Sequence, residues 1–185
     1  MGELVDGPWR MPWLRSDTGA VWLDLLATVS GAYGPTPRER LTDTEALAWW
    51  LTVEDLLPLA ELTEQDLLDA RALRAALRGV ALAVLHDQPI SPAEVIVLND
   101  HLAADRPLTW PSSPPATARQ ALARVAREAA ETLTGTRRTE LRQCADTECG
   151  LLFLDAAGRR RWCAAEVCGV RNRVRAHRER TRTSP

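Results

Sequence analysis

The chain has 185 residues, of which 45% are hydrophobic and 26% are charged. This length and composition suit one globular domain, or a domain with a small module, and exclude a collagenous, low-complexity or wholly disordered protein. The net charge of −2 conceals a division along the chain: residues 1–136 carry 11 Arg against 19 acidic residues, whereas residues 137–185 carry 12 Arg against 6. An acidic body followed by a basic segment suggests that the second part binds a polyanion.

The N-terminal residues, Met1–Arg15, contain charges and prolines where a secretory signal would need an unbroken apolar run. No apolar stretch reaches the length of a membrane span. We therefore expect a cytoplasmic protein with no membrane partner. A reducing compartment disfavours disulfide bonds, so the cysteines need another explanation.

After an irregular arm over residues 1–18, the body is predicted to be all-α over residues 1–136, because apolar residues recur at helical spacing and no segment alternates with a period of two. The expected helices run over about Ala20–Ser30, from a capping box at Thr42 and Glu45 through Leu51, over Val53–Leu59, from Thr63 with Asp66 as capping partner to about Asp87, from Ser91 and Pro92 to about Ala104, and from about Thr117 to Leu133. The proline-rich stretch 106–117 is expected to be a loop.

Three of the seven tryptophans, Trp22, Trp49 and Trp50, fall on predicted helices. They could line a pocket for a small-molecule effector, although Trp at helical spacing more often belongs to a core. The sequence contains no phosphate loop, nucleotide-binding glycine pattern or legible catalytic constellation, so we expect no enzymatic activity.

All four cysteines, Cys144, Cys149, Cys163 and Cys168, lie in the last 42 residues and form two C-x4-C pairs separated by 13 residues. Two such pairs brought together supply the tetrahedral thiolate set that Zn²⁺ prefers. Disulfides, unrelated buried thiols and an iron–sulfur cluster are the alternatives, and the clustering, spacing and cytoplasmic setting favour zinc. Four thiolates leave no open coordination position, so we expect a structural ion that stabilises a segment poor in large apolar residues.

Within this segment, Leu151–Leu154 is expected to be a short strand that runs into a turn, with Phe153 and Trp162 packed around the metal. From about Ala164 the sequence is compatible with a helix. At about 100° per residue, Val167, Val170 and Val174 form an apolar strip next to a cationic face. We expect this strip to pack on the module. A second basic row consists of Arg173, His177 and Arg180.

A metal-anchored basic helix is typical of modules that dock in the major groove of DNA. The expected nucleic-acid contacts are Arg159, Arg160, Arg161, Arg171, Arg173, Arg175, Arg178 and Arg182. The alternative is a solvated basic tail that pairs with the acidic body.

The segment RRRWCAAEVCGVRNRVRAHRER resembles the CGNR zinc finger, whose signature is R-R-W-C, a four-residue gap, then Cys-Gly-Asn-Arg and a basic helix, and QCADTECGLLFLD resembles the first half of that finger. Residues 20–135 resemble the ABATE domain through WLDLLATV, the DLLPLAEL region, ALRAALRGVAL and VLNDHLA. The resemblance implies a bacterial, stress-related transcription regulator with a helical domain over residues 1–136 and a DNA-binding finger over residues 137–185.

The same resemblance implies that Cys144, Cys149, Cys163 and Cys168 are the zinc ligands, and Gly169 and Arg171 match the signature. Val170 stands where the signature has Asn, and Ala27 stands where the helical domain usually has Asn before Thr28. The leading interpretation is a mainly α transcription regulator that binds double-stranded DNA as a homodimer, with a body that senses an effector or mediates dimerisation. The alternative is a zinc-containing adaptor that binds RNA or an acidic protein.

Overall fold

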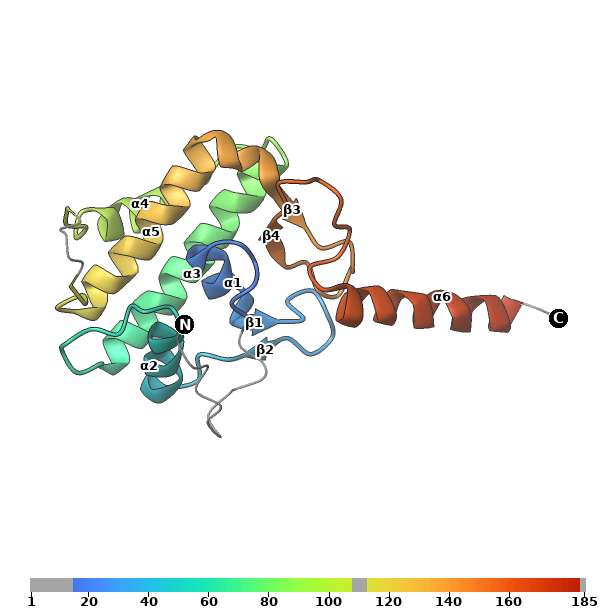
Figure 1. Cartoon of the computed structure of the whole chain (residues 1–185), viewed down its shortest axis with the longest axis horizontal. Helices are drawn as coiled ribbons and strands as arrows, with labels where there is room; N and C mark the ends of the chain where they lie inside the picture. Colours follow the sequence, from blue (N-terminus) through green and yellow to red (C-terminus); the bar gives the residue numbers. More distant parts are fainter. Residues whose placement is uncertain (1–14, 108–112, 184–185) are drawn as a thin grey trace, which may run out of the picture.

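The computed structural model describes residues 15–107 and 113–183. Five helices form the body: α1 (Val21–Ala27), α2 (Thr44–Val53), α3 (Glu64–Leu85), α4 (Pro92–Leu102) and α5 (Ala118–Thr134). A 3₁₀ turn, η1 (Thr136–Glu140), leads to a hairpin of β3 (Leu141–Gln143) and β4 (Leu152–Leu154), and a π-helical turn, η2 (Ala165–Gly169), leads to α6 (Val170–Thr183). The predicted fold class, a helical body with a small four-cysteine module and a basic helix, is confirmed (Figure 1).

The core of the body is built around α3, which packs against α1, α4 and α5. Leu67, Leu73 and Leu77 of α3 are buried, and they belong to one hydrophobic cluster with Leu25 of α1 and Leu122 of α5. Each buried leucine contributes about 2 kcal/mol relative to an exposed one. This shared core places the long helices side by side, with the terminal module at one side of them (Figure 1).

Side-chain caps set the starts of α3 and α5 where the sequence predicts them, whereas α4 begins after Ser91 without a side-chain cap. Thr63 and Asp66 form the predicted capping box at the start of α3, and the Thr117 hydroxyl accepts from the Gln120 backbone N–H at the start of α5. The prediction for α2 is wrong by one residue, because Asp43 rather than Thr42 accepts from the Ala46 N–H, at 2.8 Å. A charged carboxylate has taken the capping position in place of the neighbouring hydroxyl.

The helix predicted over Val53–Leu59 does not form. The backbone of Asp55 has a positive φ of 55°, which ends the helical path just after α2. The following residues extend instead, and the N–H groups of Leu59 and Ala60 donate to the carbonyls of Pro115 and Ala116. A tertiary backbone pairing therefore replaces the local helix.

The body also contains a hairpin that the prediction of an all-α body missed. Strands β1 (Val29–Ser30) and β2 (Arg38–Glu39) pair antiparallel, with Val29 opposite Glu39. Two residues per strand are too few to produce a visible alternation in the sequence. The hairpin is held by Arg74 of α3, whose guanidinium donates to the Glu39 carboxylate and, at 2.7 Å, to the Thr28 hydroxyl.

The terminal module and the body share backbone contacts and one core. Leu141, Leu152 and Leu154 of the β3–β4 hairpin belong to the same buried cluster as the body helices. The Leu154 N–H donates to the Thr18 carbonyl at 2.8 Å, and the Tyr33 N–H donates to the Glu148 carbonyl at 3.3 Å. The body therefore supplies part of the hydrophobic support that the module lacks. No described helix combines the length and apolar character needed to cross a membrane.

Candidate metal centre and nucleic-acid interface

The four cysteines lie on two turns that the hairpin brings together. Cys144 follows β3, and its N–H donates to the Leu151 carbonyl at 2.8 Å, while Cys149 closes a tight turn through its N–H and the Asp146 carbonyl. Gly150 ends this turn with φ of +56°, a conformation that favours glycine. Cys163 and Cys168 belong to the second turn, in which the Cys168 N–H donates to the Ala164 carbonyl.

The sulfur positions fit a tetrahedral zinc ion. All four Sγ atoms lie within 4.8 Å of one another. The Cys163 Sγ lies 3.7 Å from that of Cys149 and 3.6 Å from that of Cys168. A regular tetrahedron with Zn–S bonds of about 2.3 Å has sulfur–sulfur edges of about 3.8 Å, whereas a disulfide would need about 2.0 Å. The arrangement matches shared coordination and does not match disulfide pairing, and all four thiols are free.

The protonation of the four sulfurs shows why the cluster needs a cation. Hydrogen bonds from Cys149 and Cys163 lower the pKa of Cys144, while the hydrogen bond with Cys144 raises the pKa of Cys149 and of Cys163. Burial and the charges of neighbouring sulfurs raise the pKa of Cys168 to about 12. One thiolate is therefore favoured in the cluster alone, and four become stable only with a cation among them.

Arg15 contributes a contact to this centre that the sequence analysis missed. Its Nη1 lies 3.5 Å from the Cys163 Sγ, and its Nη2 donates to the Cys163 carbonyl at 3.1 Å. Asp17 holds the guanidinium in place from the other side. A cationic group here partly neutralises the negative charge of four thiolates. Nothing in the sequence pairs Arg15 with a cysteine so far along the chain.

Aromatic and small residues surround the sulfurs, as predicted. Phe153 is buried beside Cys144, Cys163 and Cys168, and Trp162 is partly buried against the same cluster. Ala27 of α1 completes this apolar shell, at the position where the related helical domain usually has Asn. A Cβ on Gly169 would lie 3.2 Å from the Trp162 ring, so the glycine of the signature permits the close approach of the indole.

Asp146, which the sequence analysis did not single out, joins the first cysteine turn to α6. Its carboxylate is fully buried and lies 3.0 Å from Arg171 Nη1 and 2.9 Å from Arg175 Nη1. Arg175 also pairs with Glu148 at 2.5 Å. Burial alone would raise the pKa of Asp146, but the hydrogen bonds from Arg175 and the Glu148 N–H and the charges of both arginines lower it below its ordinary value. The carboxylate therefore stays ionised and anchors the helix.

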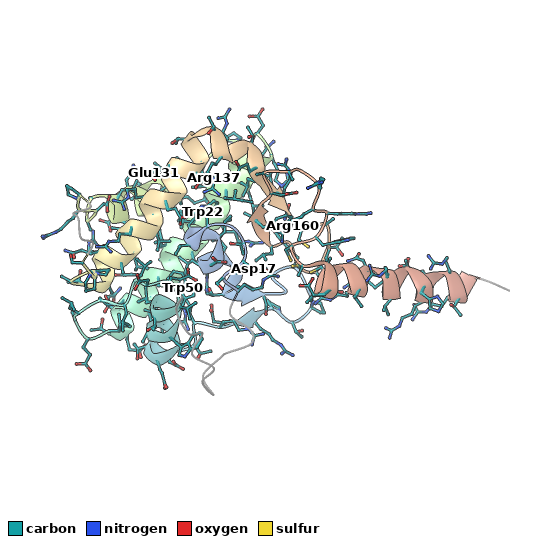
Figure 2. The ribbon with its side chains drawn as sticks, in the orientation of Figure 1. Asp17, Trp22, Trp50, Glu131, Arg137 and Arg160 are labelled. Atoms are coloured by element: carbon teal, nitrogen blue, oxygen red, sulfur yellow. The ribbon has the colours of Figure 1, made fainter. Side chains whose placement is uncertain are left out.

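The eight arginines expected at a nucleic-acid interface fall into three groups. Arg171 and Arg175 are bound to Asp146, so they orient α6 within the protein. The Arg160 guanidinium lies over the Phe153 ring and that of Arg161 lies over the Trp162 ring, and both arginines are exposed next to the metal centre. Figure 2 labels Arg160. The remaining arginines are exposed: Arg159 before the second cysteine pair, and Arg173, Arg178 and Arg182 along α6.

The prediction that the valine strip packs on the module is wrong. Val167, Val170 and Val174 are 50%, 42% and 43% exposed. Helix α6 projects away from the rest of the molecule, so its strip meets solvent along most of its length (Figure 1). The pattern in the sequence indicated an amphipathic helix, but it could not show that the arginine side, rather than the valine side, faces the module.

The three tryptophans do not form the effector pocket that the sequence suggested. Trp22 and Trp50 are fully buried in the helical core, and Trp49, next to Trp50 on α2, is partly exposed (Figure 2). Large aromatic side chains at helical spacing fill the core here. Within the described residues, the indole N–H groups of Trp22 and Trp50 have no hydrogen-bond partner.

Comparison with protein families gives two matches. The family ABATE, described as "putative stress-induced transcription regulator", matches residues 19–136. The CGNR zinc finger matches residues 140–181, which include the four cysteines and most of α6. No curated protein matches the chain. The finger match and the sulfur geometry agree, and the four-cysteine cluster is a structural zinc site.

Proposed function

The chain belongs to the ABATE family and carries a CGNR zinc finger, and from this premise we propose that it regulates transcription by placing α6 on duplex DNA. The observation that carries the proposal is the attachment of α6 to the zinc module at two points. Cys168 lies in the turn that enters α6, and Asp146 holds Arg171 and Arg175 of the helix. A basic helix with both anchors is presented in one orientation.

The zinc ion closes its coordination sphere with four thiolates, so its contribution is to fix the two cysteine turns. The exposed Arg173, Arg178 and Arg182 then extend beyond the body on a helix of 14 residues. Arginine binds phosphate bidentately and also hydrogen-bonds guanine edges. Arg159, Arg160 and Arg161 lie at the root of the same surface, where they add cationic charge beside the helix.

We further propose that the protein acts as a homodimer and without catalysis. A helix of about 21 Å covers only a short stretch of one groove, so two copies on two half-sites supply the area of a specific complex. The closed thiolate sphere supports a non-enzymatic role for the metal. The sensing of an effector stays a prediction, and Trp22 and Trp50, as core residues, do not support it.

A salt titration of the zinc-loaded full chain tests the proposal. The affinity for duplex DNA is expected to fall steeply with salt concentration, because arginines that bind phosphates displace counterions. Duplex DNA, single-stranded DNA and RNA compete in the same gel-shift series, with an acidic polypeptide as a fourth competitor. A salt-independent affinity, or preference for RNA or the polypeptide, would reject DNA binding and favour the adaptor.

A further inference from the structure

The exposed strip on α6 lies between two rows of arginine. At about 100° per residue, Val170, Val174 and His177 fall within an arc of roughly 60°. Arg173 and Arg180 flank this arc on one side, and the row that begins with Arg171 flanks it on the other. Both valines are more than 40% exposed, at 42% and 43%. Two exposed valines with cationic borders on both sides therefore lie on the free face of the helix, and the polar His177 continues the same arc.

The anchoring by Asp146 determines which part of the helix is available. Asp146 holds Arg171 and Arg175 close to the module, whereas Arg178 and Arg182 continue the same row beyond it and are exposed. Around the helix axis, the centre of the valine arc lies about 110° from the side of the helix that carries Arg171 and Arg175 and faces Asp146. The projection of α6 leaves this arc accessible to a large partner (Figure 1).

The charge around the strip identifies the kind of partner. A second copy of α6 packed on the valines would bring two arginine-rich helices together, and like charges at close range oppose that contact. A polyanion meets both rows favourably. The major groove of DNA is about 12 Å wide, admits a helix, and has phosphates along both walls. With the exposed Arg173 on one side and the exposed Arg178 on the other at the phosphates, the residues between them face the edges of the bases.

We propose, as a deepening of the proposed function on which this inference rests, that Val170 and Val174 recognise thymine through its C5-methyl group. The methyl of thymine is the apolar group that a base pair presents in the major groove. Uracil lacks it, so the contact favours DNA over RNA. Val170 occupies the position of the signature Asn. Asn is able to hydrogen-bond adenine, whereas Val is suited to an apolar contact with a methyl group.

The test begins with selection of preferred sites from a random duplex pool by the zinc-loaded full chain. Each thymine of the selected site is then replaced, one at a time, by deoxyuridine, which keeps the base pair and removes only the methyl. Fluorescence anisotropy measures the Kd for the wild type, V170A and V174A. Val53 of α2 is also 42% exposed and lies in the body, so V53A is the matched control. Circular dichroism and zinc content verify the fold of each variant.

At one or two thymines, deoxyuridine is expected to weaken wild-type binding about fourfold, which is the effect of burying one methyl group. For each of V170A and V174A, deoxyuridine at the thymine that the missing valine would contact should leave the Kd unchanged. The Kd of V53A should respond to deoxyuridine like that of the wild type. This loss of response in a matched pair of valine and thymine identifies the contact itself.

An unchanged Kd for every deoxyuridine duplex overturns the inference. If steep salt dependence persists in that result, the proposed DNA binding stands without methyl recognition. If no duplex binds at any salt concentration, the proposed function fails as well. If V170A or V174A converts a dimer to a monomer in sedimentation and the response to deoxyuridine remains, the strip belongs to a self-association surface, and the inference is again overturned.

Discussion

Arg175 and Asp146 form the contact that sets the direction of α6, with the Arg175 Nη1 lying 2.9 Å from the Asp146 Oδ1. The carboxylate is fully buried inside the first cysteine turn, whereas the guanidinium is partly exposed at the base of the helix. The pair therefore connects the ligand turn of Cys144 and Cys149 to the helix that follows Cys168. If either group is removed, the cysteines should still bind zinc, but α6 should no longer be held in one direction.

We expect D146N to loosen α6 and to lower the free energy of unfolding by about 1 kcal/mol, because the partly exposed Arg171 and Arg175 lose the charged partner of their hydrogen bonds. Chemical denaturation with zinc present measures this change. E166Q, at an exposed position on the neighbouring turn, is the control and should stay close to the wild type. Equal stability of D146N and E166Q would contradict the anchoring role.

Two arginines on one row of α6 should have opposite phenotypes. R178A removes an exposed side chain, so the slope of log affinity against log salt concentration should fall by about one while stability is unchanged. R175A removes the partner of Asp146 and Glu148, so stability should fall and the salt slope should be retained. Anisotropy titrations and denaturation of both variants decide the matter. A full salt-slope change in R175A would mean that it binds phosphate.

Zinc binding should release about three protons near neutral pH. The pKa of Cys144 is lowered by its hydrogen bonds from Cys149 and Cys163, whereas the pKa values of Cys149, Cys163 and Cys168 are raised. Because protons compete with the metal for sulfur, zinc affinity should decrease as the pH falls. Titration of metal-free protein with zinc in a weakly buffered indicator solution counts the protons. Release of fewer than two would contradict the assignment of one thiolate to the metal-free cluster.

Asp24 should make the body less stable as the pH rises. Burial raises the pKa of this carboxyl to about 7 from 3.8, against the hydrogen bonds from Thr18. The folded state thus retains a proton that the unfolded state has lost, and this stabilisation is complete below the unfolded pKa and disappears as the pH rises through about 7. D24N should remove part of the dependence and stabilise the protein at pH 8, on the order of 2 kcal/mol.

Denaturation curves between pH 4 and pH 8 measure the effect of D24N. Burial also raises the pKa of Glu54 and of Glu128, so the variant should flatten the pH profile only in part. D69N, at a partly exposed position on α3, is the control for the change of charge. A D24N profile parallel to that of the wild type would show that Asp24 titrates normally in the folded protein.

Local signals in the sequence were enough for the features that depend on neighbouring residues. Thr63 with Asp66 predicted the start of α3, and the spacing of the cysteines predicted the zinc site. Asp43, one residue beyond the predicted cap of α2, shows the limit of such signals, since both Thr42 and Asp43 suit the position.

The features that were missed depend on contacts between distant segments. Asp146 meets arginines 25 and 29 residues further along the chain, so its role could be found only once the second cysteine turn had been placed. The β1–β2 hairpin depends on Arg74 from α3. The outward orientation of Val170 and Val174 likewise follows from which side of α6 the buried carboxylate attracts.

The contact between Arg15 and Cys163 spans 148 positions of the chain, and Thr18 pairs with β4 beside it. A ribosome therefore finishes nearly the whole polypeptide before the partners of these early residues emerge. The finger is therefore not independent of the rest of the chain. A fusion that contains only residues from 137 onward would lack the backbone pairing of Thr18 with β4 and the Arg15 guanidinium beside Cys163. Chimeric regulators that borrow this finger should include the segment from Arg15 to Ala20.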